Sequence, residues 1–576
     1  MILQALTSLY EALAQKGEIS KEGWSREKIS FALGIDENGD LLRITPLFET
    51  VDMPKGKKKE EPQKMMVPIK VGNKSPKFLW GNSGFILGAA NDKTPEKAKE
   101  CFERNRQFHH QLLDKVDSPA AKAILNFFDG WEPEKTTENE LVAQYASELL
   151  GSANMVFRFN GKFVHEIPEL SAAWQTHYGA AQTEKEQCLI TGMLDAIPET
   201  HPLIKGIQGA QSSGAALVSF NGPAFCSYNK LQNHNAPVGK YAAFAYTTAL
   251  NHLLADKSNV HRIGDASVVC WAENADKQYE DFAAEVFFGD NVDKSDEQRL
   301  SALRTSLKLL ADGLPCKEMD LDPDRKFYIL GLSPNAARIA VRFFYCDSFG
   351  KIAGNIYRHH ERLEIVRPSY DKFPILPLWK LLSATVNPNA KDKTPNAAMA
   401  GAVARAVFSG GRYPASLLEC TFLRIKAERN ITRERAAIIK AYYLRNPNEK
   451  CPKEVLTVSL NENSKNIPYT LGRLFSVYEE IQQAANPGIN TTIKDRYFGS
   501  AAAMPATVFP ILSNLAQKHL RKLSDAQRVY LDKKVMTLKS VLGEQYPAHM
   551  SLPEQGSFDL GYYHQTQARY TKKEDK

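Results

Sequence analysis

The pattern of apolar residues changes at Pro368, and this change constrains the fold more than any other feature of the sequence. Before it, segments that alternate apolar and polar residues, as strands do, are interspersed with segments of helical period. After it, apolar residues recur at helical spacing only. The 576 residues are too many for one ordinary core. We therefore predict an α+β domain at 1–367, a basic helical connector at 368–450 and an all-α C-terminal four-helix bundle at 451–576.

The first part begins with an expected helix at 1–16 and an expected hairpin that turns at Glu37-Asn38-Gly39. The run Pro54–Lys64 is charged and has no large apolar side chain except its prolines, so we predict a flexible tongue there. The remaining strands are expected at 155–164, 215–220, 267–272, 327–332 and 338–345, and the remaining helices at 94–116, 120–128, 138–150, 239–254 and 297–312.

The helical part is expected to contain two sets of helices separated by a linker at 447–453. The first set is predicted at 372–384, 395–407, 414–427 and 432–444. The second set, which would form the bundle, is predicted at 469–485, 507–523, 526–542 and 553–570.

A stretch of small and amide-bearing residues, Lys205–Leu254, is the strongest candidate for ligand binding. Glycines at its start allow close approach of the backbone to a ligand. Amide and hydroxyl groups follow, interleaved with Phe225 and Tyr228, and neutral donors of this kind favour binding over catalysis. An ordinary surface connection between a strand and a helix is the alternative. The polar loop Val71–Lys77 is a second candidate, with a solvated hairpin tip as its alternative.

Two catalytic motifs fail in this stretch. Gly209 and Gly214 have the spacing of a P-loop, but alanines stand where Lys and Ser/Thr are required. Neither Ser212 nor Ser213 lies in a G-x-S-x-G nucleophile elbow. The acidic run from Glu318 to Asp324 lacks the residues of a calcium loop, so a solvated turn is the simpler interpretation, and we predict no metal or cofactor.

Basic helical segments are the strongest physicochemical signal. The net charge is only +7, but Met399–Lys450 contains 10 Lys/Arg and 4 Glu. Guanidinium groups suit phosphates, although a solvated helix face paired with glutamates is the alternative. The first cluster is Arg405, Arg412, Arg424, Lys426, Arg429, Arg433, Arg435 and Lys440. The second is Lys494, Arg496, Lys518, Arg521 and Lys522, near Tyr497, Phe498 and His519, a mixture that fits a single nucleic-acid strand.

The cysteines and the N-terminus indicate a cytoplasmic protein. The eight cysteines include no C-x-x-C pair, so neither a zinc site nor a disulfide framework is expected. The first residues read as an amphipathic helix rather than a signal peptide, and no apolar run reaches the roughly 20 residues of a membrane span.

Several segments together resemble a known family. They are MILQALTSLYEAL, FLWGNSGFILG, SSGAALVSFN, YILGLSPNAARIAVRFF and the tail from NPGINTTIKDRYFGSAAAMPATVFP to LPEQGSFDLGYYHQTQARY. In this order, from Met1 to about Tyr570, the chain resembles the large subunit of the type I-C CRISPR Cascade surveillance complex. The resemblance implies a non-catalytic subunit that recognises the protospacer-adjacent motif in duplex DNA, promotes R-loop formation and recruits the helicase-nuclease.

The resemblance also implies partners. These are the crRNA, the target double-stranded DNA with its displaced strand, the Cascade backbone and crRNA-processing subunits, the helicase-nuclease, and a separate small subunit made from the same gene, which the C-terminal bundle would resemble. An internal start for that product would fall near Val455, where the sequence has no methionine. No membrane partner is expected.

Two sets of residues are predicted to contact DNA. Small polar side chains suit the limited donor and acceptor pattern of a minor groove. Motif or duplex contacts are predicted for Asn73, Lys74, Gln211, Ser212, Ser213, Asn221, Asn233 and Asn235. Single-strand or backbone contacts are predicted for Arg405, Arg412, Arg424, Lys426, Arg429, Lys494, Arg496, Lys518, Arg521 and Lys522. The competing hypotheses are a scaffold that holds the crRNA and backbone subunits, and a metal-dependent nuclease using Glu318, Asp320 and Asp322.

Overall fold

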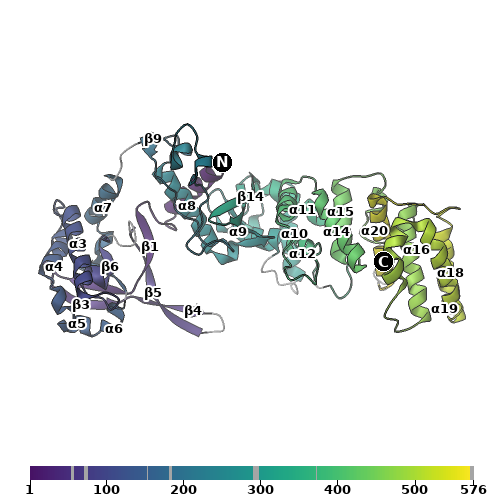
Figure 1. The fold of residues 1–576 in the computed structure, drawn as a ribbon, viewed down its shortest axis with the longest axis horizontal. Coiled ribbons are helices and arrows are strands. Elements are labelled where there is room, and N and C mark those ends of the chain that lie inside the picture. The colour runs from purple at the N-terminus through teal and green to yellow at the C-terminus, as the bar shows by residue number, and fades with distance from the viewer. Residues whose placement is uncertain are drawn as a thin grey trace. The chain divides into compact units, whose positions relative to one another are not determined.

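The computed structural model describes residues 1–53, 57–69, 76–151, 153–180, 185–289, 297–371 and 373–570. Apart from the first two residues, contacts divide the chain into two compact units (Figure 1). Unit 1 comprises Leu3–Pro202 and Ser219–Ala249, and unit 2 comprises Leu203–Val218 and Leu250–Lys576. Each unit is described by itself below.

Unit 1 is built around a mixed sheet in the order β3-β2-β7-β6. The predicted hairpin is confirmed, because β2 and β3 pair antiparallel across the Glu37–Gly39 turn, whereas β2 and β7 run parallel. Aromatic side chains of α4 pack on the sheet, as the edge-to-face contact between Phe127 and Phe157 illustrates. The strands are β2 (Phe31–Ile35), β3 (Leu41–Pro46), β6 (Trp80–Asn82), β7 (Asn154–Phe159) and β8 (Lys162–Phe163), which pairs with β7.

The helices of unit 1 follow the apolar pattern where that pattern is long. The predictions at 1–16, 94–116 and 120–128 are confirmed, but the segment predicted as one helix at 138–150 contains two short helices. The bounds are α1 (Ile2–Gln15), α2 (Ser83–Ile86), α3 (Pro95–Leu113), α4 (Pro119–Gly130), α5 (Glu140–Ala143), α6 (Ala146–Leu149) and α7 (Pro168–Ala180).

The prediction of a flexible tongue at Pro54–Lys64 is wrong for those of its residues that the structure describes. Residues 54–56 lie outside the described part, but Lys57–Pro68 is strand β5, which pairs with β1 (Trp24–Ile29) and β4 (Phe48–Met53) in the order β1-β5-β4. Glu61 explains how a charged strand is accommodated. Its carboxylate lies 2.7 Å from Lys28 Nζ on β1 and 3.0 Å from Lys59 Nζ. Opposite charges on paired strands stabilise a sheet whose face is polar.

Unit 2 contains an antiparallel sheet in the order β11-β12-β13-β14. Its central strand β12 is buried at every residue, which fits its continuous apolar sequence. The predictions at 267–272, 327–332, 338–345 and 297–312 are confirmed. The elements are β11 (His261–Ile263), β12 (Ala266–Ala272), β13 (Lys326–Asn335), β14 (Arg338–Ser348), α9 (Lys277–Ala283), α10 (Glu297–Ala311) and α11 (Phe349–Leu363).

In the sequence, the segment from β8 to β11 is less regular than predicted. The helix expected at 239–254 is present as α8 (Lys240–Ala255), and a small hairpin of β9 (Lys185–Gln187) and β10 (Leu194–Ala196) precedes it. The strand expected at 215–220 is wrong. Only Ala215 and Ala216 form isolated bridges, because glycines and a Ser-Phe-Asn-Gly-Pro sequence on either side end the pairing.

From residue 397 onward the described chain is helical, which confirms the predicted fold class. In Figure 1, α16, α18, α19 and α20 lie side by side as a bundle. A further helix, α17, was not predicted, and the linker expected at 447–453 packs against the bundle, because Cys451 is buried and Ser557 of α20 donates to Lys450 O at 3.2 Å. The bounds are α12 (Leu378–Ser383), α13 (Ala397–Ser409), α14 (Ala415–Glu428), α15 (Arg433–Arg445), α16 (Ile467–Ala485), α17 (Ile493–Ala503), α18 (Pro505–Leu520), α19 (Asp525–Lys539) and α20 (Leu552–Ala568).

No helix in the described ranges is long and apolar enough to cross a bilayer. The division into domains at 367 and 450 stays a prediction, since the two contact units follow tertiary packing and not function.

Candidate nucleic-acid interface

The start of the polar stretch forms an exposed tip in unit 2, which we call the Gln211–Ser213 tip. Ile204 and Ala215 exchange both backbone hydrogen bonds at 2.9 Å, and the Gly214 N–H closes the turn onto Gln211 O at 2.9 Å. Gly209 and Gly214 have φ values of 82° and 108°, which side chains rarely adopt. The glycines therefore shape a tight loop that leaves Gln211, Ser212 and Ser213 exposed.

This tip is fixed to the main sheet of unit 2 at the β13–β14 turn. The Ala216 N–H donates to Ala337 O and the Ile339 N–H donates to Ala216 O, both at 3.0 Å. Two backbone bonds to a well-paired hairpin hold the loop at a defined position. The three predicted residues of the tip are thus brought together on a braced support.

Cations that the sequence analysis did not single out lie beside the tip. Arg262 on β11 contacts the Gln208 side chain and donates from Nε to Gly264 O at 3.1 Å. Lys205 is exposed, and its backbone N–H is held by Asn251 Oδ1 at 2.8 Å. Arg262 is the exposed member of a strand whose neighbours are buried, and that alternation is a signal that could have drawn attention to it.

The second half of the stretch lies in unit 1 and places its asparagines differently. Asn221 is exposed, whereas Asn233 is only 3% exposed and donates from Nδ2 to Val238 O at 3.3 Å. Asn235 accepts the Ser227 N–H at 2.8 Å and donates to the carbonyls of Lys230 and Gln232. Both side chains organise their own loop, so a base contact by Asn233 would require this loop to open.

The whole stretch is free of carboxylates. Between Glu199 and Asp256 the sequence has no Asp or Glu, although the chain as a whole has 66. Lys205, Lys230 and Lys240 are the fixed charges that the segment itself carries, and the carboxylates that contact it from β9 and β10 are held by His234 (Glu186, 2.5 Å) and by the Tyr241 N–H (Asp195, 3.0 Å). The other predicted motif residues, Asn73 and Lys74, lie outside the described residues.

The first basic cluster separates into exposed and buried cations. Arg405, Arg412, Lys426 and Arg429 are exposed, and Arg424 is half-buried with its guanidinium 3.8 Å from Glu428. Arg405 also donates to Arg342 O at 3.3 Å. The exposed side chains remain available for phosphate groups.

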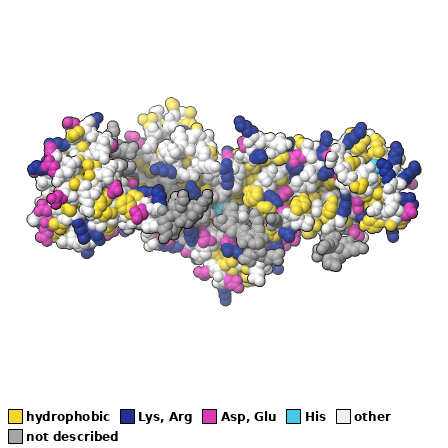
Figure 2. All heavy atoms as spheres, turned by 90° about the horizontal axis from the view of Figure 1, so that it is seen from below, with side chains coloured by type: hydrophobic (Ala, Val, Ile, Leu, Met, Phe, Trp, Pro, Cys, Tyr) yellow, Lys and Arg dark blue, Asp and Glu magenta, His cyan; other side chains and the backbone are white. Residues whose placement is uncertain are grey.

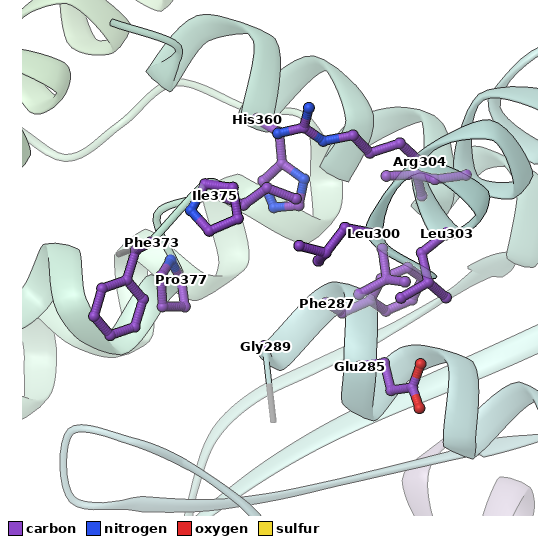
Figure 3. Close-up of a pocket in the computed structure, with 13 residues that line it drawn as sticks. Glu285, Phe287, Gly289, Leu300, Leu303, Arg304, His360, Phe373, Ile375 and Pro377 are labelled. Carbon is purple, nitrogen blue, oxygen red and sulfur yellow. The ribbon is translucent and has the colours of Figure 1, made fainter. Parts of the chain in front are cut away.

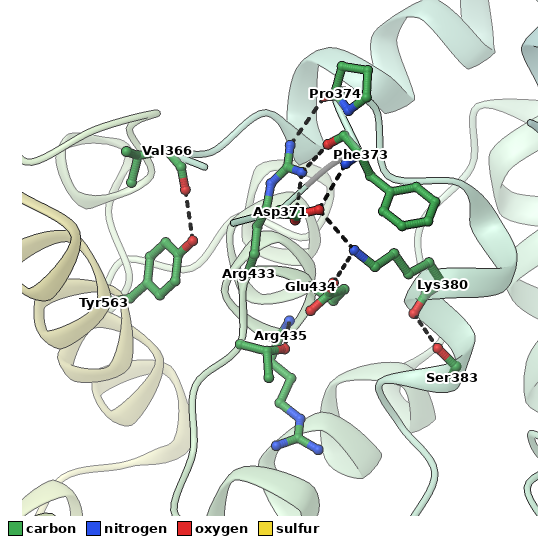
Figure 4. Close-up of polar contacts among 11 residues, drawn as sticks. Val366, Asp371, Phe373, Pro374, Lys380, Ser383, Arg433, Glu434, Arg435 and Tyr563 are labelled. Carbon is green, nitrogen blue, oxygen red and sulfur yellow. Dashed lines mark hydrogen bonds and ion pairs between the residues drawn. The ribbon is translucent and has the colours of Figure 1, made fainter. Parts of the chain in front are cut away.

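Arg433, Arg435 and Lys440 are not exposed, so the expectation that they face nucleic acid is wrong. Arg433 lies 3.0 Å from Asp371, and its guanidinium also donates to the carbonyls of Phe373 and Pro374 (Figure 4). Arg435 pairs with Glu428 at 2.6 Å, and Lys440 donates to Arg362 O at 3.1 Å. These cations join α15 to the 371–374 segment, to the end of α14 and to the C-terminal end of α11.

Burial and hydrogen bonds shift the pKa values of the ionisable groups around α15. Burial alone would raise the pKa of Asp371, but the Phe373 N–H and the Arg433 guanidinium hold it below its usual range. Lys380 bridges Asp371 at 3.3 Å and Glu434 at 2.8 Å (Figure 4). Burial lowers the pKa of Lys440 to about 8. The network therefore joins α12, α15 and the 371–374 segment.

The second basic cluster belongs to the C-terminal bundle. Lys518, Arg521 and Lys522 are exposed at the end of α18. Arg496 on α17 is exposed beside the Tyr497 ring, and Lys494 lies half-buried near Asn430 Oδ1. On the face shown in Figure 2, Lys and Arg side chains are interspersed with neutral and hydrophobic ones over these helices. On this face the cations are separate and do not form one uninterrupted basic patch.

An apolar cavity of about 70 Å³ lies between α10, α11 and the 373–377 segment (Figure 3). Phe287, Leu303 and Ile375 line it, with Arg304 and His360 at its edge. Drug-sized ligands occupy roughly 300–1,000 Å³, so this cavity is small for a ligand site.

The acidic residues of the nuclease hypothesis lie on an exposed loop. Glu318, Asp320, Asp322 and Asp324 are all exposed, and the Asp322 carboxylate accepts the Asp324 N–H at 2.9 Å. Within the described ranges, no group of three or more His, Cys, Asp or Glu is arranged to hold a metal ion.

Polar loops without carboxylates and exposed cationic helices, on an α/β region followed by a helical bundle, are typical of proteins that contact a polyanion. The comparison with family models matches residues 6–570 to Cas_Csd1, described as a CRISPR-associated protein. The chain therefore belongs to the Cas_Csd1 family, the large subunit of type I-C Cascade, and the resemblance inferred from its sequence is confirmed. No curated protein matches the chain.

Proposed function

We propose that this chain recognises the protospacer-adjacent motif in duplex DNA, promotes R-loop formation and recruits the helicase-nuclease, without catalysing a reaction itself. The observation that carries the proposal is the Gln211–Ser213 tip, whose exposed side chains stand on a braced hairpin beside Lys205 and Arg262. Amide and hydroxyl groups can read a minor groove, and the neighbouring cations can contact its phosphates.

The proposal assigns a role to each part of the chain. Residues 1–367 read the motif, 368–450 connect, and 451–576 act as a counterpart of the small subunit. The exposed cations of α14, α17 and α18 contact backbone phosphates of the crRNA or of the displaced strand. Tyr563 of α20 donates to Val366 O at 2.7 Å, which supports a bundle anchored to the rest of unit 2.

Binding of the assembled complex to matched duplexes that differ only in the flanking motif tests the reader role. Complexes with and without this chain, and with Gln211→Ala or Ser212→Ala/Ser213→Ala, are compared at two salt concentrations. We expect motif-dependent binding only with the wild-type chain, and a loss of about 1–3 kcal/mol per removed base contact. Equal motif preference in the tip variants would remove the tip from the reader.

Recruitment has a separate test. Purified helicase-nuclease is mixed with target-bound complexes that contain or lack this chain, and co-migration is measured. We expect co-migration only when the chain is present. Equal co-migration without it would assign recruitment to another subunit.

The buried cations favour a scaffold role for part of the connector, because Arg433, Arg435 and Lys440 bind other parts of the chain itself. A scaffold without DNA contact is therefore the second candidate function. Photo-crosslinkers placed at Arg412 and Lys522 distinguish the two. Adducts with DNA support the binding role, and adducts with only protein or crRNA support the scaffold.

A further inference from the structure

A loop in unit 1, Gly222–Val238, holds an aromatic side chain almost entirely in solvent. Tyr228 is 97% exposed, and among the described residues it has no hydrogen bond or ring contact. Single exposed apolar groups are common on protein surfaces, so exposure alone assigns no role. The left-handed backbone of this loop and the hydrogen bonds within it are two independent observations.

The backbone at this position is strained. Tyr228, Asn229 and Gln232 have φ values of 53°, 58° and 46°, in the left-handed region that disfavours side chains. A bulky residue such as Tyr rarely adopts this conformation, and glycine would adopt it at little cost. Strain of this kind concentrates at functional sites.

The loop is also braced from within. The Lys230 N–H closes a turn onto Ser227 O at 3.0 Å, so Tyr228 and Asn229 occupy its tip. The Asn235 side chain is hydrogen-bonded to both sides of this turn, because it accepts the Ser227 N–H and donates to Lys230 O. The buried Asn233 fixes the base of the loop through Val238. Asn233 and Asn235 are thus positioning residues for Tyr228.

The charged residues near Tyr228 indicate what kind of ligand its ring could bind. Lys230 is exposed two residues away in the sequence, and no carboxylate lies between Glu199 and Asp256. The Glu186 carboxylate that contacts the loop from β9 is paired with His234 at 2.5 Å. An exposed aromatic side chain at the tip of a held turn, with an exposed lysine two residues along the chain, suits the base stacking and phosphate contact by which single nucleic-acid strands are bound. A base-paired duplex offers no free face to such a ring, whereas an unpaired base does.

We propose that Tyr228 is a stacking platform for an unpaired nucleobase, with Lys230 at the adjoining phosphate. This inference rests on the proposed function, because it places the chain against nucleic acid. An unpaired base can come from the crRNA outside the guide–target duplex or from the target DNA once it opens, and the experiment below separates these sources.

The test is photo-crosslinking in the assembled complex. 5-Iodouracil is placed at unpaired positions of the crRNA in one arm and of each target strand in the other, and the crosslinked residue is mapped by mass spectrometry. We expect a crosslink at Tyr228 in one arm, which identifies the source. Tyr228→Ala should abolish it and weaken binding of that strand by roughly 5- to 150-fold, the range for one stacked base.

Matched variants separate stacking from loss of fold. Tyr228→Phe keeps the ring and should keep the crosslink and the affinity. Asn235→Ala should lower the crosslink yield with Tyr228 still present, because the turn is released. Tyr370, 83% exposed without a left-handed backbone, is the control, and Tyr370→Ala should change neither readout.

Two results would overturn the inference. One is an absent crosslink in both arms together with unchanged affinity of Tyr228→Ala. The other is p-benzoylphenylalanine at position 228 forming adducts only with a partner protein. Motif preference is measured in the same samples, so the two proposals fail separately. A Tyr228 crosslink without motif preference contradicts the reader role alone, and motif preference without the crosslink contradicts stacking alone.

Discussion

Burial, more than charge, distinguishes the cations between Arg405 and Lys440. Arg412 and Lys426 extend into solvent, whereas the guanidinium of Arg433 is enclosed with Asp371. Exposed cations can contribute to binding of a phosphate backbone. Enclosed cations contribute to folding, and removing one leaves its partner charge buried.

Arg433→Met should destabilise the chain by about 3–5 kcal/mol, because the Asp371 carboxylate would lose its guanidinium partner while it stays buried, and Lys380 lies farther away, at 3.3 Å. Urea unfolding of the full chain at pH 7 measures the change. Arg412→Met is the exposed control and should alter stability by at most about 0.5 kcal/mol. Asp371→Asn added to Arg433→Met should restore part of the loss. Equal stabilities of the two single variants would contradict the structural role.

Lys518→Ala/Lys522→Ala should weaken DNA binding equally for all flanking motifs, since both side chains are exposed and can contact phosphates only non-specifically. The slope of log K against log salt should fall by about 1 per lost phosphate contact. Titrations at several salt concentrations measure it, with Gln211→Ala as the comparison that should change motif preference instead. A motif-selective loss in the lysine variant would contradict this assignment.

At this scale the sequence predicts side-chain chemistry better than side-chain exposure. The residue types at Arg433 and Asn233 suited phosphate and base contacts, yet both are buried by partners distant in the sequence or by their own loop. Gln211, Ser212 and Ser213 are exposed because glycines at 209 and 214 keep their loop short. Local sequence sufficed in that case.

Among the elements, α16 and α20 cross with their backbones in close approach. A Cβ atom at Gly472 would lie 2.0 Å from Phe558 O, and one at Gly561 would lie 2.1 Å from Tyr469 O. Backbone oxygens cannot move aside as flexible side chains do, so the two helices approach this closely only with glycine at both positions.

Gly561→Ala should therefore force α16 and α20 apart and destabilise the bundle by about 1–3 kcal/mol. Thermal unfolding of the full chain measures the change. Gly499→Ala on α17 is the matched control, because nothing lies within 4 Å of its added methyl group. It should stabilise the helix by about 0.5–1 kcal/mol. Destabilisation of similar size in both variants would contradict the crossing.

Elements with a long apolar period were predictable, and elements held by tertiary contacts were not. The apolar stripe along α16 was sufficient to predict that helix. Strand β5 was predicted as a tongue because its charges satisfy each other only when β1 and β4 are adjacent. Helix α17 is short and ends in three alanines, so its sequence lacks a strong apolar pattern, and its capping box at Thr492 and Asp495 was the signal that remained.

For the whole molecule, the limit of sequence reasoning lies in long-range pairing. The carboxylate-free stretch was recognisable as one region, but residues 205–218 belong to unit 2 and 219–249 to unit 1. The division follows from Ala216, which pairs with the β13–β14 turn more than a hundred residues further along the chain. No local pattern indicates such a partner, so the tip and the Tyr228 loop could not be assigned to different units beforehand.

Buried neutral histidines couple the stability of both units to pH. His109 in unit 1 accepts the Leu79 N–H at Nε2 and faces Asn105 O with Nδ1, an arrangement that fits the neutral ring. Burial lowers the pKa of His109 and of His165 to about 4, and that of His564 in unit 2 to about 3. An unfolded histidine titrates near 6.5.

Lowering the pH from 7.5 to 5 should therefore destabilise both units. In this range the unfolded chain binds protons at these histidines and the folded chain does not, so the free energy of unfolding falls with pH. The loss is about 2 kcal/mol per histidine at pH 5. Urea unfolding at pH 7.5, 6 and 5 measures it. His564→Gln should unfold with a shallower pH dependence, because it removes one such proton site. Stability that stays constant or rises toward pH 5 would mean that these rings accept protons while still folded.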